Sequence, residues 1–223
     1  MELVPILKTK GDVEVLISGI QADLPLPFQV DHRLKGLSFI FGKHGVVDIW
    51  NTYMKLNSLR LLSEVRGLDV TGYDLVISDF EPVSAWACIL AKKPCIGMSN
   101  QIATLHPRAP KPKKVDPLGH MILEKYAPST FQYGFHFKRL DHNIYTPIIR
   151  KEVREKETSN NGHYTVYLPS YGEEKINKNL GSFRKIDWQV FSKHHQKPVR
   201  YKNIKINPLN KDKFLNSMAT SAG

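Results

Sequence analysis

The chain has 223 residues, 41% of them hydrophobic, and a formal net charge of +11 at neutral pH. This length can bury one large core or two small ones, and the composition excludes a disordered tail, a collagen-like repeat and a disulfide-rich scaffold. The longest apolar runs, residues 13–20 and 85–91, are far shorter than the roughly 20 residues of a membrane-spanning helix, and we expect no signal segment. Cys88 and Cys95 match no metal or redox spacing, which predicts a reduced, cytoplasmic compartment.

The positive charge is concentrated in the second half of the chain. Residues 1–105 contain 10 Lys and Arg against 11 Asp and Glu, whereas residues 106–223 contain 22 against 10. This asymmetry indicates an anionic partner. Charge alone leaves the partner open among nucleic acid, an anionic membrane surface and a phosphorylated ligand.

Short apolar runs of strand length alternate with patterns of helix length. In chain order, we expect the end of an amphipathic helix over 1–7, a strand over 14–18, a helix within 47–65, a strand over 74–78, a helix over 82–90, strands over 95–98, 133–137, 164–168, 188–191 and 204–206, and a helix over 214–219. This alternation is typical of an α/β fold with mostly parallel sheets flanked by helices.

Two polar segments interrupt the pattern. Residues 107–116 hold three prolines and four basic residues, which predicts an extended, exposed loop. Residues 151–162 are almost wholly polar and precede a new buried strand, so we expect a linker between a domain over 1–150 and a second over 163–223. The pattern begins with a helix that no strand precedes, and it ends where the next strand of a parallel sheet is expected. We therefore expect both domains to be incomplete.

Polar side chains follow three of the expected strands. In an open α/β sheet, ligands bind outside the carboxyl ends of the strands. A carboxylate there can orient or deprotonate a hydroxyl group, and a serine hydroxyl beside backbone N–H groups can bind phosphate. The residues in these positions are Asp79, Glu81 and Ser84 after strand 74–78, Ser99, Asn100 and Gln101 after strand 95–98, and Ser170 after strand 164–168.

These residues also have structural interpretations. Asp79 can cap the helix that begins at Pro82, and residues 99–101 can make ordinary hydrogen bonds at the end of a strand. His44, in the loop Gly42-Lys-His-Gly, can approach a cleft or remain a solvated loop histidine. Both interpretations stay open on the sequence alone.

The sequence around three further histidines indicates structural or surface residues. His136 lies between two phenylalanines in a strand pattern, which is typical of a structural histidine. His194 and His195 lack carboxylate or thiol companions at metal spacing, so we expect surface residues and no metal site.

Five parts of the sequence stand out together: YDLVISDFEPVSAWA, KPCIGMSNQ, the basic proline-rich loop, YGFHF and HYTVYLPSYGEE. These parts resemble a bacterial family of glycosyltransferases of the GT-B superfamily. The family is more distantly similar to the lipid-linked N-acetylglucosamine transferase of peptidoglycan synthesis, and the resemblance covers nearly the whole chain. It implies two Rossmann-like lobes, an acceptor-side lobe over 1–150 and the first part of a donor-side lobe from 163, with the active site in the cleft between them.

The resemblance implies transfer of a sugar from a nucleotide-sugar donor, UDP-linked in our expectation, to a hydroxyl of a glycan or lipid-linked acceptor, without a metal or other cofactor. We therefore predict Asp79 and Glu81 as catalytic residues, Ser170 at the donor phosphate, and an acceptor site formed by His44, Ser84, Ser99, Asn100 and Gln101.

The sequence departs from the family pattern in two respects. Asn100 stands where the family has the histidine of Ser-His-Gln, and an amide cannot act as a base near neutral pH. The strand and Gly-rich turn expected before Met1 and the Gly-rich strand–helix segment expected after Gly223 are missing from the sequence. We therefore expect a chain that is truncated at both ends and inactive in isolation.

The alternative to an enzyme is a non-catalytic remnant that binds anions or glycolipid through a basic face. The cations of this face can contact a diphosphate-linked lipid or an anionic membrane, and the protein would then lie at the inner face of that membrane. They are Lys111, Lys113, Lys114, Lys138 and Arg139. We expect no nucleic-acid partner, because residues 108–114 contain no aromatic side chain and no nucleic-acid-binding motif is present.

Overall fold

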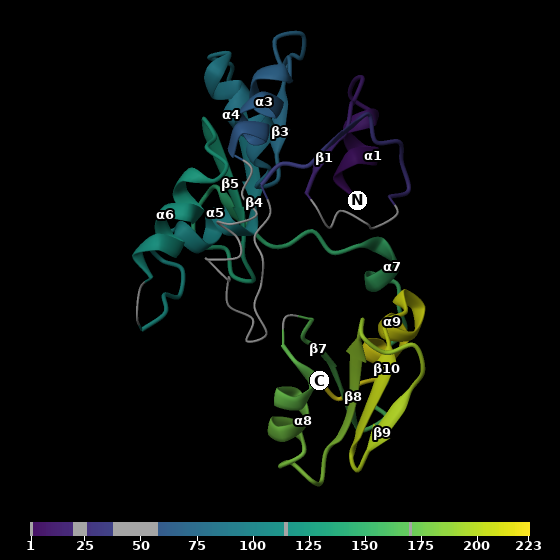
Figure 1. Cartoon of the computed structure of the whole chain (residues 1–223). Helices are drawn as coiled ribbons and strands as arrows, with labels where there is room; N and C mark the ends of the chain where they lie inside the picture. The colour runs from purple at the N-terminus through teal and green to yellow at the C-terminus, as the bar shows by residue number, and fades with distance from the viewer. Residues whose placement is uncertain (1, 20–25, 38–57, 114–115, 170) are drawn as a thin grey trace. The chain divides into compact units, whose positions relative to one another are not determined.

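The computed structural model describes residues 2–19, 26–37, 58–113, 116–169 and 171–223 (Figure 1). These residues form two compact units. The described part of unit 1 comprises 2–19, 26–37, 58–113 and 116–148, and that of unit 2 comprises 149–169 and 171–223. Each unit is an α/β layer structure with parallel strands flanked by helices, so the predicted fold class is confirmed.

Unit 1 contains a four-stranded parallel sheet and a two-stranded parallel pair. The sheet has the order β3 (Val76–Ser78), β4 (Cys95–Ser99), β5 (Phe131–Phe135) and β6 (Ile144–Tyr145), and the pair is β1 (Leu16–Ser18) and β2 (His32–Leu34). The helices are α1 (Leu3–Lys8), α3 (Ser58–Gly67), α4 (Pro82–Leu90), α5 (Asn100–Leu105) and α6 (Pro117–Lys125).

The core of unit 1 forms where α3 and α4 pack beside β3. Helix α4 buries six of its nine residues, including Val83 and Cys88, against Val76 and Cys95 of the neighbouring strands. Helices α5 and α6 lie together on the β4–β5 side of the sheet (Figure 1). Parallel strands are apolar on their faces, and these helices bury part of that apolar surface.

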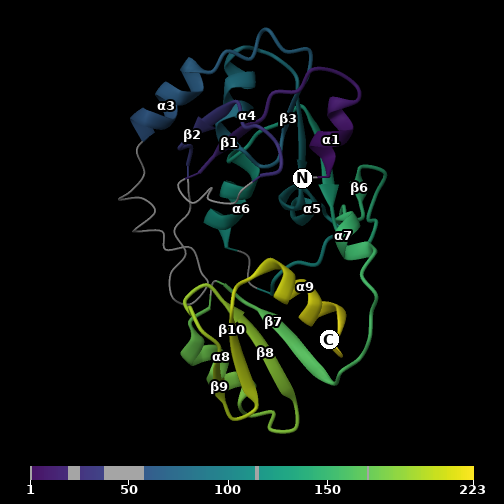
Figure 2. The same cartoon turned by 90° about the vertical axis from the view of Figure 1, so that its right-hand side faces the viewer.

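Unit 2 contains a four-stranded sheet in which one strand is antiparallel. The order is β7 (His163–Tyr167), β8 (Asp187–Ser192), β10 (Ile204–Pro208) and β9 (Val199–Tyr201), and Figure 2 shows these strands side by side. Strands β7, β8 and β10 are parallel, whereas β9 forms a hairpin with β10. The helices are α7 (Lys151–Arg154), α8 (Glu173–Leu180) and α9 (Lys211–Ala219).

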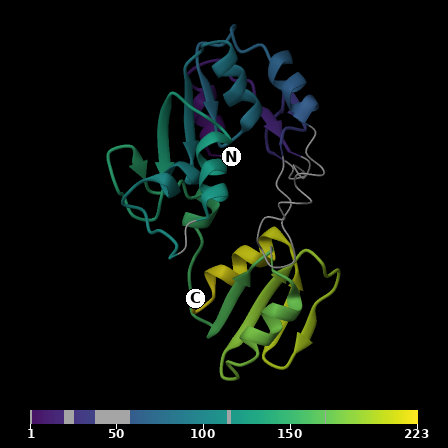
Figure 3. The same cartoon turned by 60° about the vertical axis from the view of Figure 1, so that its left-hand side comes forward.

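Helices α8 and α9 cover opposite faces of this sheet (Figure 3). Successive side chains of a strand point to opposite faces. In β8, Val190 packs in the cluster that contains Ile176 of α8, whereas the next residue, Phe191, contacts Phe214 of α9 with ring centroids 5.3 Å apart. The alternation within β8 therefore accounts for the two helical layers of unit 2.

Several element boundaries differ from the sequence prediction. The strand expected over 133–137 is β5, Phe131–Phe135, and the helix expected within 47–65 is described only from Ser58, as α3. The segment 151–162, predicted as a linker, begins with the short helix α7. Residues 107–113 and 116 form no helix or strand, as predicted for the proline-rich loop. None of the helices within the described ranges is long and apolar enough to cross a membrane.

Candidate functional site

Two neighbouring strands of unit 1 end in polar residues at the same edge of the sheet. Strands β3 and β4 are parallel and paired, so the loop after Ser78 and the start of helix α5 after Ser99 leave the sheet side by side. A third strand end reaches the same place, because the hydroxyl group of Ser18, the last residue of β1, lies 2.6 Å from Oε1 of Glu81. We call this region the carboxyl edge of unit 1.

Glu81 holds the start of helix α4. It is the N-cap residue, and its carboxylate accepts hydrogen bonds from the backbone N–H groups of Val83 and Ser84, both at 2.7 Å. Because Ser18 donates a third hydrogen bond, both carboxylate oxygens of Glu81 are occupied. The capping role considered for Asp79 therefore belongs to Glu81, because Pro82 opens the helix and only the residue directly before it can cap.

Asp79 lies free of this capping arrangement. The described residues provide no hydrogen-bond partner for its carboxylate, and the residue is exposed. Neighbouring protein atoms nevertheless exclude enough water from the carboxyl group to raise its pKa above the usual value. Asp79 is thus an exposed carboxyl group at a strand end, with a raised pKa.

Phe80, between the two carboxylates, adopts a left-handed backbone conformation with a φ of 52°. Such a conformation costs a non-glycine residue on the order of 1–3 kcal/mol and is found most often at functional sites. Its ring packs on that of Tyr126, with centroids 4.8 Å apart, and burial raises the pKa of Tyr126 to about 12. This turn separates Asp79 from Glu81, so that one carboxylate caps the helix while the other remains available.

The predicted acceptor residues divide into buried and accessible groups. Ser99 is 2% exposed and accepts a hydrogen bond from the N–H group of Ile102, so it caps α5, and Ser84 is buried in the first turn of α4. Asn100 is exposed and Gln101 is half-buried. The predictions for His44 and Ser170 lie outside the described residues.

A small cavity lies behind the carboxyl edge. Its volume is about 20 Å³, and Ser78, Phe80, Ser99 and Gln132 are among the residues that line it. This volume holds roughly one water molecule and no sugar. Asp79 and Asn100 lie exposed outside this cavity.

Unit 2 has a second polar group at the carboxyl ends of its strands, which the sequence did not predict. Glu173, in the first turn of α8, accepts hydrogen bonds from Ser192 at the end of β8 (2.8 Å) and pairs with Nε2 of His195 (2.6 Å). Burial raises the pKa of Glu173, but the hydrogen bonds from His195 and Ser192 outweigh it and leave the pKa lowered. His195, expected at the surface, is half-buried, and the fold supplies a carboxylate partner from a position distant in the sequence.

No group of three or more His, Cys, Asp or Glu side chains suited to a metal ion occurs within the ranges that the structure covers. Unit 1 has an exposed carboxylate at one strand edge, and unit 2 has a carboxylate–imidazole pair at one strand edge. In open α/β sheets, ligands bind outside the carboxyl ends of the strands, where these groups lie.

The α/β layers, with polar loops at the carboxyl ends of parallel strands, fit the Rossmann-like lobes of GT-B glycosyltransferases. A comparison with protein families matches residues 7–223 to the family described as Glycosyl transferase family 1. The chain belongs to this family. Comparisons with curated proteins and with solved structures found no match.

Proposed function

We propose that the chain transfers a sugar from a nucleotide-sugar donor, UDP-linked, to a hydroxyl group of a glycan or lipid-linked acceptor. Membership of Glycosyl transferase family 1 supports sugar transfer between a donor and an acceptor. Unit 1 would form the acceptor side and unit 2 the start of the donor side, corresponding to lobes over 1–150 and 163–223. The observation that carries the proposal is the available carboxylate of Asp79 at a strand end of unit 1.

In this mechanism, Asp79 is the base that accepts the proton of the acceptor hydroxyl. Its raised pKa supports the role, because a base is most effective when its pKa approaches the working pH. Glu81, proposed from the sequence as a second catalytic residue, instead acts through position: its three hydrogen bonds fix the turn that carries Asp79.

The other residues would bind and orient substrates. Asn100 and Gln101 are accessible enough to hydrogen-bond acceptor hydroxyls, while Ser99 caps α5 and the backbone N–H of Ser84 donates to the cap Glu81. We propose His44 as a further acceptor contact and Ser170 as a donor-phosphate contact, from their positions in the sequence. The departing diphosphate would be stabilised by backbone N–H groups at the strand ends of unit 2.

The test is sugar transfer by the complete reading frame that encodes the chain, assayed as release of nucleoside diphosphate with a panel of nucleotide sugars and acceptors. Asp79→Asn should lower the rate by about 10²- to 10⁴-fold, the usual contribution of a general base. Asp74→Asn is the matched control, because Asp74 is an exposed aspartate before the amino end of the same strand. Equal rates for Asp79→Asn and wild type would remove Asp79 from the mechanism.

A second candidate is a non-catalytic module that binds anions or glycolipid. The observation that favours it is Asn100, exposed at the start of α5 where the family pattern has a histidine. This function predicts that no donor is turned over in the complete reading frame, while binding to anionic glycolipid persists and weakens with salt.

A further inference from the structure

Two loops of unit 1 together form a strongly cationic surface. The loops are residues 106–113 and 136–143, and we call their joint surface the cationic loop pair. It contains five cationic side chains and one acidic one, Asp141. The cations are all exposed: Arg108, Lys111, Lys113, Lys138 and Arg139.

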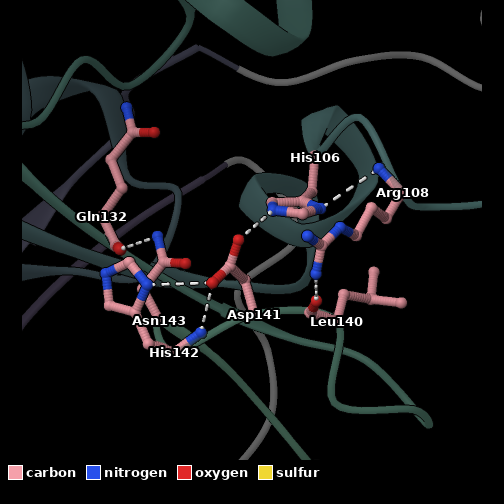
Figure 4. A network of polar contacts seen from close by, with 7 residues as sticks. All are labelled: His106, Arg108, Gln132, Leu140, Asp141, His142 and Asn143. Atoms are coloured by element: carbon pink, nitrogen blue, oxygen red, sulfur yellow. Dashed lines mark hydrogen bonds and ion pairs between the residues drawn. The ribbon is translucent and has the colours of Figure 1, made fainter.

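A network of polar contacts joins the two loops (Figure 4). Nη1 of Arg108 donates a hydrogen bond to the carbonyl oxygen of Leu140 at 2.9 Å, and Nε2 of His106 lies 3.4 Å from Oδ2 of Asp141. The other ring nitrogen of His106 accepts a hydrogen bond from the N–H group of Arg108 at 3.2 Å. The loops are therefore tied to each other through both backbone and side chains.

The same network uses the only acidic group of the surface. Asp141 Oδ1 accepts hydrogen bonds from the N–H group of His142 (2.7 Å) and pairs with its ring Nδ1 (2.9 Å), while Oδ2 faces His106. The hydrogen bonds from His142 hold the pKa of Asp141 at about 2, so the carboxylate stays ionised. Both of its oxygens are paired with histidines, and the five exposed cations have no other acidic residue within the loops.

An exposed aromatic side chain projects from this cationic surface. Phe137 is 91% exposed and is followed directly by Lys138 and Arg139. Its one ring neighbour among the described residues is His136, at 6.3 Å and edge-on. Arg139 lies over the ring of Tyr145, 5.7 Å from its centroid, a cation–π contact that holds the guanidinium group.

We propose that the cationic loop pair docks on an anionic lipid membrane, with Phe137 entering the interface between headgroups and acyl chains. The cations match the anionic headgroups, and each cation near the surface raises the affinity for the membrane about fivefold. The aromatic ring matches the acyl chains, because it leaves water when it enters the interface. Single-stranded nucleic acid fits less well, because successive bases need several open aromatic faces and the pair offers one. The inference does not depend on the proposed transfer.

The position of the surface relates it to the carboxyl edge. Ser99 of β4 pairs with Gly134 of β5, so the loop that carries Phe137 leaves the sheet one residue beyond the level of Ser99. If unit 1 receives the acceptor, as proposed above, a docked membrane would lie next to the residues that bind it. A lipid-linked acceptor is the class of acceptor that this arrangement favours.

The experiment is co-sedimentation of the full chain with vesicles of phosphatidylcholine alone or with 30% phosphatidylglycerol. We expect binding to the anionic vesicles, weakening as salt rises from about 0.05 to 0.5 M, and none to the neutral vesicles. Lys138→Ala/Arg139→Ala should lower the affinity about 25-fold, and Phe137→Ser roughly tenfold. In a Phe137→Trp variant, the added fluorescence should be quenched by brominated lipids.

Matched controls separate this surface from general charge. Lys178→Ala/Lys185→Ala removes two exposed cations of unit 2, and Leu59→Ser removes a side chain of α3 that is 80% exposed. Both should bind anionic vesicles like wild type. Equal losses in the control and the loop variants, or no binding to anionic vesicles, would overturn the proposal. So would tighter binding to single-stranded RNA that the loop substitutions abolish, since it would identify a nucleic-acid surface.

Discussion

Replacing Glu81 by alanine should destabilise unit 1 locally without removing a reacting group. The substitution deletes three hydrogen bonds, from Val83, Ser84 and Ser18, at 2.6–2.7 Å. Loss of an N-cap costs about 1 kcal/mol, and loss of a hydrogen bond to a charged group costs about 1.5–3 kcal/mol. Because the three bonds share one carboxylate, their costs are not additive, and we expect a total of about 2–3 kcal/mol.

Hydrogen exchange followed by mass spectrometry measures this cost where it arises. Peptides that cover α4 should exchange about 30- to 150-fold faster in Glu81→Ala, whereas a peptide that covers α8 in unit 2 serves as the internal reference and should not change. Glu81→Gln should be intermediate, because the amide oxygen can still accept while the NH₂ group cannot.

Asp79→Ala is the paired control, since no described residue hydrogen-bonds to Asp79. It should leave the exchange of α4 unchanged. Exchange within threefold of wild type in Glu81→Ala, together with faster exchange in Asp79→Ala, would refute the assignment of the cap to Glu81.

Three further predictions concern packing and pH. Gly134→Ala should cost unit 1 about 1–3 kcal/mol in urea unfolding, because an added Cβ would lie 2.7 Å from the backbone nitrogen of Ala103; a stability equal to wild type would contradict this packing. The carboxyl carbon of Asp141 should titrate in NMR with a midpoint of about 2. The stability that the ionised carboxylate adds to the folded chain is complete above the usual carboxyl pKa and should be lost as the pH falls through that midpoint. A midpoint near 3.8 would mean that the loop network is not formed. Asp79→Asn should stabilise the chain at neutral pH, because the raised pKa of the Asp79 carboxyl group means that the folded state disfavours its ionised form. The gain in stability should disappear below about pH 4, where the carboxyl group is protonated in the unfolded chain as well. A gain that persists in acid would point to another cause.

The sequence predicted the elements whose signals are local. Pro82 begins a helix as expected, because proline fits the first helical turn, and the strand predicted over 95–98 differs from β4 by one residue. The sequence leaves open whether Asp79 caps this helix; in the structure, the side chain of Glu81 caps it from the position next to Pro82.

The features that the sequence did not predict depend on contacts between distant positions. Glu173 and His195 are 22 residues apart and meet only because β7 and β8 are parallel neighbours. The β9–β10 hairpin turns through Lys202, with a φ of 53°, and its Lys-Asn pair lacks the glycine that marks such turns. The ion pair between His106 and Asp141 likewise forms only because the residue after α5 packs against the β5–β6 loop.

The central claim is that this member of Glycosyl transferase family 1 transfers sugar with Asp79 as the base. The most direct measurement is acceptor-dependent release of nucleoside diphosphate from nucleotide sugars by the complete reading frame, compared among wild type, Asp79→Asn and Asp74→Asn. We predict release by wild type and Asp74→Asn, and a rate about 10²- to 10⁴-fold lower in Asp79→Asn. The absence of release with every donor, from a folded protein that still binds anionic vesicles, would contradict the claim and identify a non-catalytic binding module.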